Sequence, residues 1–185
     1  MSVLTEERTA VVHGEPAICA PSSACPTLVT GVRWFPARSA KPEDVVCELL
    51  RAIGADLPEP VRNSAPVLLV ASRLSERKVG TFVAQCRDTA RRPRPLASVR
   101  METSLTLQRF ADRTGWSGAA YALVTPGGDA SGSALKWATA GITAGRFPAA
   151  YLCEVVPSPG AEDEALAFGY TVRASDLAGR EFFHD

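Results

Sequence analysis

The feature that most constrains the fold is the alternation of short apolar runs with amphipathic stretches. Three runs are almost wholly apolar: Ala65–Ser72, Ala119–Thr125 and Ala149–Val156. Runs of this length and composition are typical of strands that are buried on both faces of a parallel sheet. Strands that alternate with helices predict an α/β fold with a mostly parallel sheet.

The first amphipathic stretch predicts a helix that ends at Gly54. Pro42 suits the first helical position, and two acidic residues follow it, where the helix dipole favours them. The apolar positions are spaced i, i+3, i+4 and i+7, and they are Val46, Leu49, Leu50 and Ile53.

Three further helices are expected. The first begins at Ser75, which is predicted to cap it, and ends before Pro93; its apolar stripe comprises Val79, Phe82, Val83, Cys86 and Ala90. A shorter helix is expected over Ser104–Gly115, with the glycine as its stop. Another is expected over Ser131–Ala144, buried centrally and ended by Gly145.

Two more strands complete the prediction. Thr27–Phe35 is rich in β-branched and aromatic residues, and Glu164–Arg173 alternates large and small side chains with period two. The short connection before the last strand predicts antiparallel pairing with its predecessor. We therefore expect one domain over 27–185, with a five-stranded mixed sheet and helices on both faces. Residues 1–26 form an extension in which Thr9–Gly14 is a candidate extra strand.

Composition excludes several function classes. The chain has 185 residues and is neutral, with 20 basic and 20 acidic side chains, so it has no overall electrostatic footprint for nucleic acid. No apolar run reaches the length of a membrane span, and the first ten residues lack the apolar core of a secretory signal. The use of Ala, Arg and Pro, with few Lys, is typical of a high-GC bacterial gene.

The cysteines favour a reducing compartment. Their number is odd and none are spaced C-x-x-C; they are Cys19, Cys25, Cys47, Cys86 and Cys153. This pattern predicts reduced thiols in the cytoplasm, no metal site and no cofactor. A disulfide between the first two stays an open alternative.

The stretch Gly127–Phe147 has the pattern of a nucleophile loop that leads into a helix. Free N–H groups and the helix dipole at such a position stabilise an anion or a thiolate. The polar side chains there are those of Asp129, Ser131 and Ser133. Ser131 is a candidate surrogate nucleophile, although the order G-x-S-x-G is absent and no histidine is placed to act as its base.

The alternative role of Asp129 or Ser131 is helix capping. The loop also lacks the G-K-[ST] ending of a nucleotide-binding loop, so a nucleotide site is not expected. Weak binding of a phosphate or phosphopantetheine at the helix N-terminus stays open.

The order of these pieces resembles the N-terminal half of β-ketoacyl synthases, which have a thiolase-type fold. The similar segments are TLVTGVRWFP, RPLASVRMETSLTLQRFADRTGWSGAAYALVT, GDASGSALKWATAGITAGRFPAAYLCEVV and EALAFGYTVR. The resemblance runs from about Thr27 to Arg173 and implies the half-fold βαβαβαββ.

The same resemblance implies that the chemistry of the family is missing. Alignment on Ala134 and Leu135 places the catalytic cysteine of the family at Gly128, which has no nucleophile. The family also uses two histidines from a C-terminal half, which we expect to be absent. The histidines of this chain, His13 and His184, lie outside the similar region. Chain-length factors resemble ketosynthases in this way, lack the cysteine, and act as partners of an active synthase.

Partners are also implied by the resemblance. Carrier proteins of this family's pathways are acidic, so a basic cluster is a candidate dock: Arg87, Arg91, Arg92, Arg94 and Arg100. The alternative is a solvated basic loop at a helix end. Strand Ala119–Thr125 is implied to pair across a homodimer, and the small Ala119 and Ala120 would permit close approach.

Four side chains near these segments have two interpretations each. Glu154 interrupts an apolar strand and is either a site residue or a residue at the solvent end of the strand. Cys153 is expected to be a core thiol rather than a nucleophile. Trp116 and Trp137 flank the proposed dimer strand or fill the core.

The expected function is that of a non-catalytic, ketosynthase-like accessory or partner subunit in polyketide or fatty-acid-type biosynthesis. It would bind a ketosynthase, an acyl carrier protein or itself. The alternative is a small enzyme that handles acyl thioesters, an acyltransferase or hydrolase using Ser131 or Asp129. A third class is a homodimeric structural or regulatory protein without a pathway link.

Overall fold

The computed structural model describes residues 41–88, 102–124, 130–157 and 165–177. Within them the chain is an α/β protein with one four-stranded mixed sheet, in the order β2-β1-β3-β4. The strands are β1 (Val67–Val70), β2 (Ala120–Leu123), β3 (Ala149–Pro157) and β4 (Ala165–Arg173). β1 pairs parallel with both β2 and β3, whereas β4 pairs antiparallel with β3, as predicted. The expected fifth strand, Thr27–Phe35, and the extension 1–26 lie outside the described residues.

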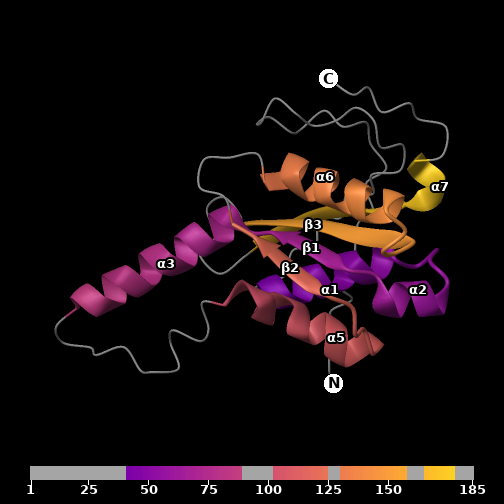
Figure 1. Ribbon diagram of the computed structural model, residues 1–185. Helices are drawn as coiled ribbons and strands as arrows, with labels where there is room; N and C mark the ends of the chain where they lie inside the picture. The colour runs from indigo at the N-terminus through magenta and orange to yellow at the C-terminus, as the bar shows by residue number, and fades with distance from the viewer. Residues whose placement is uncertain (1–40, 89–101, 125–129, 158–164, 178–185) are drawn as a thin grey trace, which may run out of the picture.

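Helices lie on both faces of the sheet, as predicted. They are α1 (Pro42–Ile53), α2 (Glu59–Ser64), α3 (Ser72–Arg87), the 3-10 helix η1 (Thr103–Leu107), α5 (Gln108–Thr114), α6 (Ala130–Thr143) and α7 (Ala174–Leu177). Figure 1 shows α6 over one face of the sheet, α1 and α5 over the other, and α3 projecting away from the body. The short helices α2 and α7 were not predicted from the sequence.

The two sheet faces carry separate cores that meet at β1. Val67 and Leu69 point into the core formed with α1 and α5. Leu68 and Val70 point into the core formed with α6. All four side chains are at most 5% exposed. The continuous apolar run of this strand is therefore explained by burial on both faces, which is the usual state of a parallel strand.

Helix α1 lies where the sequence predicts it and ends at Gly54, but the glycine is required there for a different reason than a left-handed cap. Gly54 has a right-handed φ of −90°, so it is not a left-handed cap. A Cβ there would lie 2.5 Å from the hydroxyl oxygen of Tyr151, so the glycine is needed for close approach. That hydroxyl donates to the Arg62 carbonyl at 3.2 Å, and burial raises the pKa of Tyr151 to about 12.

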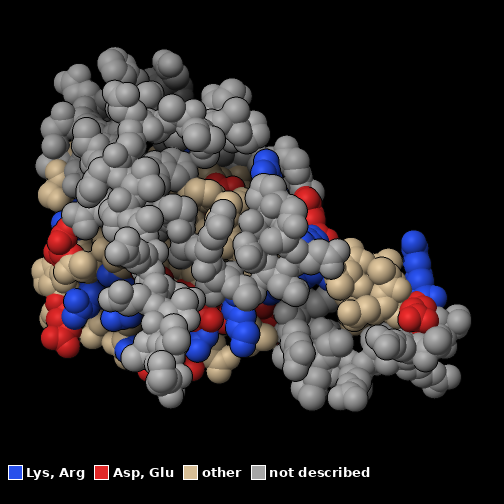
Figure 2. Space-filling view, turned by 180° about the vertical axis from the view of Figure 1, so that it is seen from behind, with Lys and Arg blue, Asp and Glu red and all other residues tan. Residues whose placement is uncertain are grey.

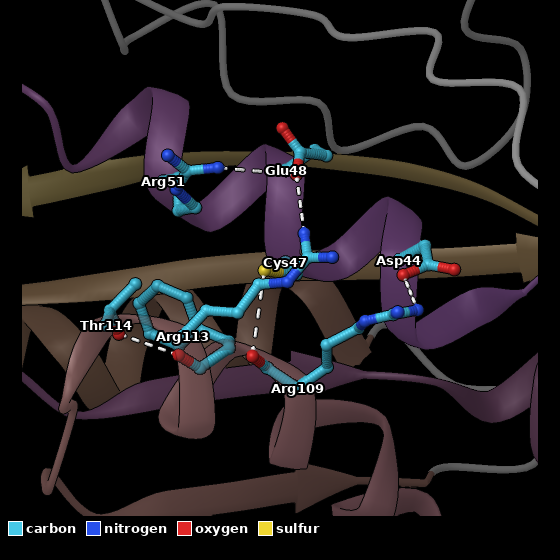
Figure 3. Close-up of polar contacts among 8 residues, drawn as sticks. Asp44, Cys47, Glu48, Arg51, Arg109, Arg113 and Thr114 are labelled. Carbon is cyan, nitrogen blue, oxygen red and sulfur yellow. Dashed lines mark hydrogen bonds and ion pairs between the residues drawn. The ribbon is translucent and has the colours of Figure 1, made fainter.

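Charged contacts join α1 to α5 (Figure 3). Arg109 pairs with Asp44, and Arg113 lies 3.3 Å from a carboxylate oxygen of Glu48. These side chains are partly exposed, and such pairs contribute only about 0.2–1 kcal/mol each. Phe110 of α5 is buried against Trp116 and against Tyr151 of β3, with ring centroids 5.7 and 6.0 Å away, and this burial contributes more than the ion pairs to holding α5 on the core.

The predicted start of α3 was wrong. The helix begins at Ser72, so Ser75 lies inside its first turns and is not the N-cap. The Ser75 hydroxyl instead hydrogen-bonds the Thr103 hydroxyl of η1 at 3.0 Å. The predicted stripe is present on one side of the helix, but it is largely exposed: Val79 is 48% and Val83 40% exposed. Ala90 of that stripe lies outside the described residues.

Two other helices differ in part from their predictions. The stretch Ser104–Gly115 divides into η1 and α5, and Gly115 ends it with a left-handed φ of 69°, as predicted. Helix α6 was expected to be buried centrally, which is wrong: its Ala134 and Ala138 face the sheet, whereas Trp137 is 36% exposed. Its apolar side covers one face of the sheet, and its outer side carries the exposed Lys136, Trp137 and Ala140.

Gly169 of β4 supplies the clearest test of this packing. A Cβ at this position would clash with the Leu152 carbonyl oxygen and lie 3.2 Å from the Cα of Cys153, and backbone atoms cannot move aside cheaply. Gly169→Ala should lower the free energy of unfolding by about 1–3 kcal/mol, measured by urea denaturation. Gly80→Ala in α3 is the control, because nothing lies within 4 Å of its Cβ and alanine favours helix. Equal stability of the Gly169 variant and the wild type would contradict the β3–β4 packing.

Candidate functional site

The candidate site lies where β3 passes the first turn of α6. Glu154 is opposite Val70, the last residue of β1, so both lie at the carboxyl end of the parallel strands. Along β3, Ala150 and Leu152 point into the α6 core, and Glu154 continues the same period-two face. Ala130, the first residue of α6, is buried in that core, which brings the start of the helix beside Glu154.

The structure brings two of the predicted candidates together. The Ser131 hydroxyl donates to a carboxylate oxygen of Glu154 at 3.0 Å, and both residues are half-buried. Glu154 is not at the end of its own strand, since it is the sixth of the nine residues of β3, but it lies opposite the last residue of β1 and contacts Ser131. Ser131 is the second residue of α6 and so is not its N-cap. Asp129 and Gly128 lie outside the described residues.

The contact accounts for the cost of placing a carboxylate in an apolar strand. Glu154 gains a hydroxyl donor and lies near the N-terminus of a 14-residue helix, where the dipole favours negative charge. The same carboxylate makes this helix end a poor site for a further anion. The phosphate or phosphopantetheine site that the sequence left open is therefore disfavoured by a negative charge that the chain itself supplies.

A serine and a carboxylate alone do not form a nucleophile of the known type. In serine hydrolases an imidazole accepts the hydroxyl proton, and the carboxylate orients that imidazole. Neither His13 nor His184 is among the described residues, so the described site has no imidazole. In the part of the chain that is described, the Ser131–Glu154 contact acts to hold the start of α6 on β3.

The two buried cysteines of the described residues, Cys47 and Cys153, have raised thiol pKa values. Burial, together with the adjacent Glu154 carboxylate, raises the pKa of the Cys153 thiol well above its usual range. Burial also raises the pKa of Cys47, whose thiol lies 3.9 Å from the Arg109 carbonyl. The interpretation of Cys153 as a core thiol is confirmed, because its side chain is 1% exposed and lies in the core formed with α1 and α5. Cys86, on α3, is exposed.

Strand β2 forms an open edge of the described sheet. The Val67 amide of β1 and the Ala71 amide directly after β1 donate to the carbonyls of Ala119 and Leu123, at 2.9 and 3.2 Å. Because N–H and C=O groups alternate in direction along a strand, those of Ala120 and Ala122 point outward. No described strand pairs with them. Ala119 and Ala120 are exposed, as the dimer prediction requires.

An aromatic cluster lies beside this edge. Tyr121 and Trp137 have ring centroids 4.5 Å apart, and Phe147 stacks on Trp137 at 5.5 Å. Tyr121 and Trp137 are 43% and 36% exposed. Trp116, by contrast, fills the core, and its indole N–H donates to the Ala65 carbonyl at 2.8 Å. Of the two tryptophans, only Trp137 lies near the surface that β2 presents.

Of the proposed carrier-protein dock, the structure describes one member. Arg87 is the last residue of α3 and is exposed. The other four members lie outside the described residues: Arg91, Arg92, Arg94 and Arg100.

The sequence analysis did not predict the Ser131–Glu154 contact or the aromatic cluster, although it singled out Ser131, Glu154 and Trp137 individually. One signal for the contact was available. Alternation along β3 places Glu154 on the face of Ala150 and Leu152, which the preceding helix covers.

No metal cluster or membrane span is found among the described residues: they hold no group of three or more metal-ligating side chains, and none of their helices is long and apolar enough to cross a bilayer.

Comparison of the chain with protein-family models, curated proteins and solved structures gives no match. The assignment of function therefore depends on the geometry and on the residues themselves.

The Ser131–Glu154 contact can be measured by a double-mutant cycle. Ser131→Ala, Glu154→Ala and the double variant should give a coupling free energy of about 1–2 kcal/mol in urea denaturation, because the bond is charge-assisted and half-buried. Ser131→Ala removes a single oxygen, but it leaves the partly buried Glu154 carboxylate without this donor. It should therefore lower the free energy of unfolding more than the loss of one hydroxyl elsewhere on the surface. Additive effects of the two substitutions would show that the contact does not hold α6 on β3.

Proposed function

We propose that this protein is a non-catalytic, ketosynthase-like accessory or partner subunit of polyketide or fatty-acid-type biosynthesis. Residues 27–185 would form the N-terminal half of a thiolase-type fold, with Thr27–Phe35 as the fifth strand. The order of the similar segments supports this proposal, and the described sheet, with its antiparallel β4, is compatible with an α/β fold.

The observation that supports a binding role best is the edge of β2, with which no strand of the described residues pairs. Its outward N–H and C=O groups lie beside exposed Tyr121 and Val124, which are 43% and 48% exposed. An unpaired strand edge with apolar neighbours is a template for pairing with another chain. A second copy of this chain, or an equivalent strand of a ketosynthase, would satisfy these groups by strand addition.

The absence of catalysis is supported by the loop before α6 and by the first turn of that helix. Gly128 stands where the family has its cysteine, and the Ser131 hydroxyl is engaged by Glu154. A chain with glycine at position 128 and with its Ser131 hydroxyl bonded to Glu154 should not catalyse a Claisen condensation by itself. Detection of that reaction with the purified chain would refute the proposal.

The strand-pairing role predicts a specific mutational effect. Ala122→Pro removes an outward N–H and leaves the β1 ladder intact, so it should convert dimer, or complex with a synthase, to free chain. Native mass spectrometry of a tagged copy purified from its source measures both species. Ala122→Ser is the matched control, because it keeps the N–H and adds a single oxygen.

Two results would contradict this role. One is a wild-type chain that is monomeric and carries no synthase or carrier protein. The other is an oligomer that survives Ala122→Pro unchanged.

A second candidate function is kept because of the Ser131–Glu154 contact. It is a small acyltransferase or hydrolase of acyl thioesters in which Ser131 attacks the thioester carbonyl and Glu154 receives the hydroxyl proton. The C–S bond then breaks and the thiol leaves with that proton, and water or an acceptor nucleophile takes the acyl group from Ser131. Asp129 is the other nucleophile candidate of this hypothesis.

The enzyme hypothesis predicts a loss that the partner hypothesis does not. If it holds, Ser131→Ala should reduce thioester hydrolysis by about 100-fold or more and leave the far-UV circular dichroism unchanged. The assay is hydrolysis of an acyl-phosphopantetheine thioester, and the rate is measured from the free thiol that is released. Background rates that are identical for wild type and variant would dismiss Ser131 as a nucleophile.

A further inference from the structure

Helix α3 is anchored to the body through its first two turns. Leu74 is its one buried residue among those described, and the Ser75 hydroxyl hydrogen-bonds the Thr103 hydroxyl of η1 at 3.0 Å. Burial lowers the pKa of Lys78, and the nearby Glu43 carboxylate opposes this shift, so the lysine side chain lies against α1. The inner part of the helix is therefore held by contacts with two other elements.

The outer part of α3, residues 79–87, has little packing of this kind. Every residue in it is exposed except Phe82, which is half-buried, and Val79 and Val83 are 48% and 40% exposed. Figure 1 shows this part projecting from the body, and Figure 2 shows it from behind, with mostly uncharged side chains open to view. Since packing normally supplies most of the stability of a helix, the outer part must depend on its own sequence.

That sequence does not favour a helix. The outer part begins with VGTFV, in which glycine, β-branched and aromatic residues all have lower helix propensity than alanine. The start of α3 gives no compensation, because it has no side-chain cap and its first turn holds Arg73 and no acid. Isolated helices shorter than about 12–15 residues are marginal in water even when their sequences are favourable. The outer part should therefore be the least stable helical segment of the described chain.

Gly80 lies where the contacts with the body end, and nothing in the packing requires a glycine there. Nothing lies within 4 Å of a Cβ built at this position, and its φ is not positive. Gly141 and Gly169 differ, because a Cβ there would clash with Phe147 and with the Leu152 carbonyl. A helical glycine that space does not require only adds backbone freedom, so Gly80 weakens α3 at the boundary between its two parts.

We propose that α3 is a two-part arm in which residues 79–87 open and refold as a unit about Gly80, while residues 72–78 stay docked. Such an order–disorder segment opens at a much lower free energy than the sheet unfolds. Opening also lengthens the arm, because the outer part spans about 14 Å as a helix and up to about 30 Å as extended chain. The proposal does not depend on the proposed function, since neither the exposure nor the glycine involves a partner.

The experiment is hydrogen–deuterium exchange of the full chain at neutral pH, measured by mass spectrometry of its peptides. Amides of residues 79–87 should exchange within about tenfold of the rate of an unfolded peptide, whereas those of α1 should be slowed by about 1000-fold or more. Gly80→Ala should slow exchange of the outer part by about fivefold and leave α1 unchanged, because alanine favours the helix. Ala84→Gly is the matched control: it is the reverse substitution in the same part and should speed exchange there.

Three outcomes would overturn the proposal. Exchange of residues 79–87 as slow as that of α1 would show that the arm opens only when the whole protein unfolds. Equal slowing of both segments by Gly80→Ala would show that arm and sheet open together. Fast exchange of residues 79–87 that neither substitution changes would show that no helix–coil equilibrium exists in this segment. None of these outcomes bears on strand pairing at β2, which its own variant tests.

Discussion

The whole described structure depends on one strand that is buried on both faces and paired on both sides. β1 has four residues, and its side chains alternate between the α1–α5 core and the α6 core. A strand of this kind has no face left for solvent, so helices are required on both sides of the sheet. Its two parallel neighbours then require crossover connections, which the helices provide.

This arrangement also decides which residues meet at the candidate site. Because β1 and β3 are parallel and adjacent, their carboxyl ends share one edge, and the helix that leads into β3 starts at the same edge. Glu154 lies on the α6 face of β3 and so reaches Ser131. The result is a helix N-terminus whose attraction for anions is used within the chain. A site arranged in this way favours a structural role over a ligand-binding one, which agrees with the partner function we propose.

Local sequence patterns predicted the elements well where local physics decides them. Helix α1 follows from Pro42 and the spacing of Val46, Leu49 and Leu50, which the core confirms by burying all three. Gly115 has the left-handed φ that a helix stop requires. The antiparallel β4 follows from a short connection and a period-two pattern.

Tertiary contacts decided what could not be predicted. Ser75 looked like a cap, but Ser72 begins the helix and Ser75 bonds Thr103, 28 residues later in the chain. Ser131 and Glu154 were each singled out, yet their contact depends on how α6 sits over β3, which no local pattern encodes. The exposure of the α3 stripe could not be predicted either, since an amphipathic pattern is the same whether the face that covers it belongs to this chain or to a partner.

The two surfaces left uncovered differ in the physics of recognition. The β2 edge offers directional N–H and C=O groups, so it selects a partner by strand geometry and is nearly independent of charge. The α3 stripe offers exposed apolar side chains on one helical face, so it selects by helical spacing and by the burial of apolar area. A chain that had only the first surface would pair with any open edge, including its own. The two surfaces are also separate, because α3 projects away from the sheet (Figure 1). A chain with two separate exposed surfaces, the β2 edge and the α3 stripe, suits the partner function we propose better than that of a protein without partners.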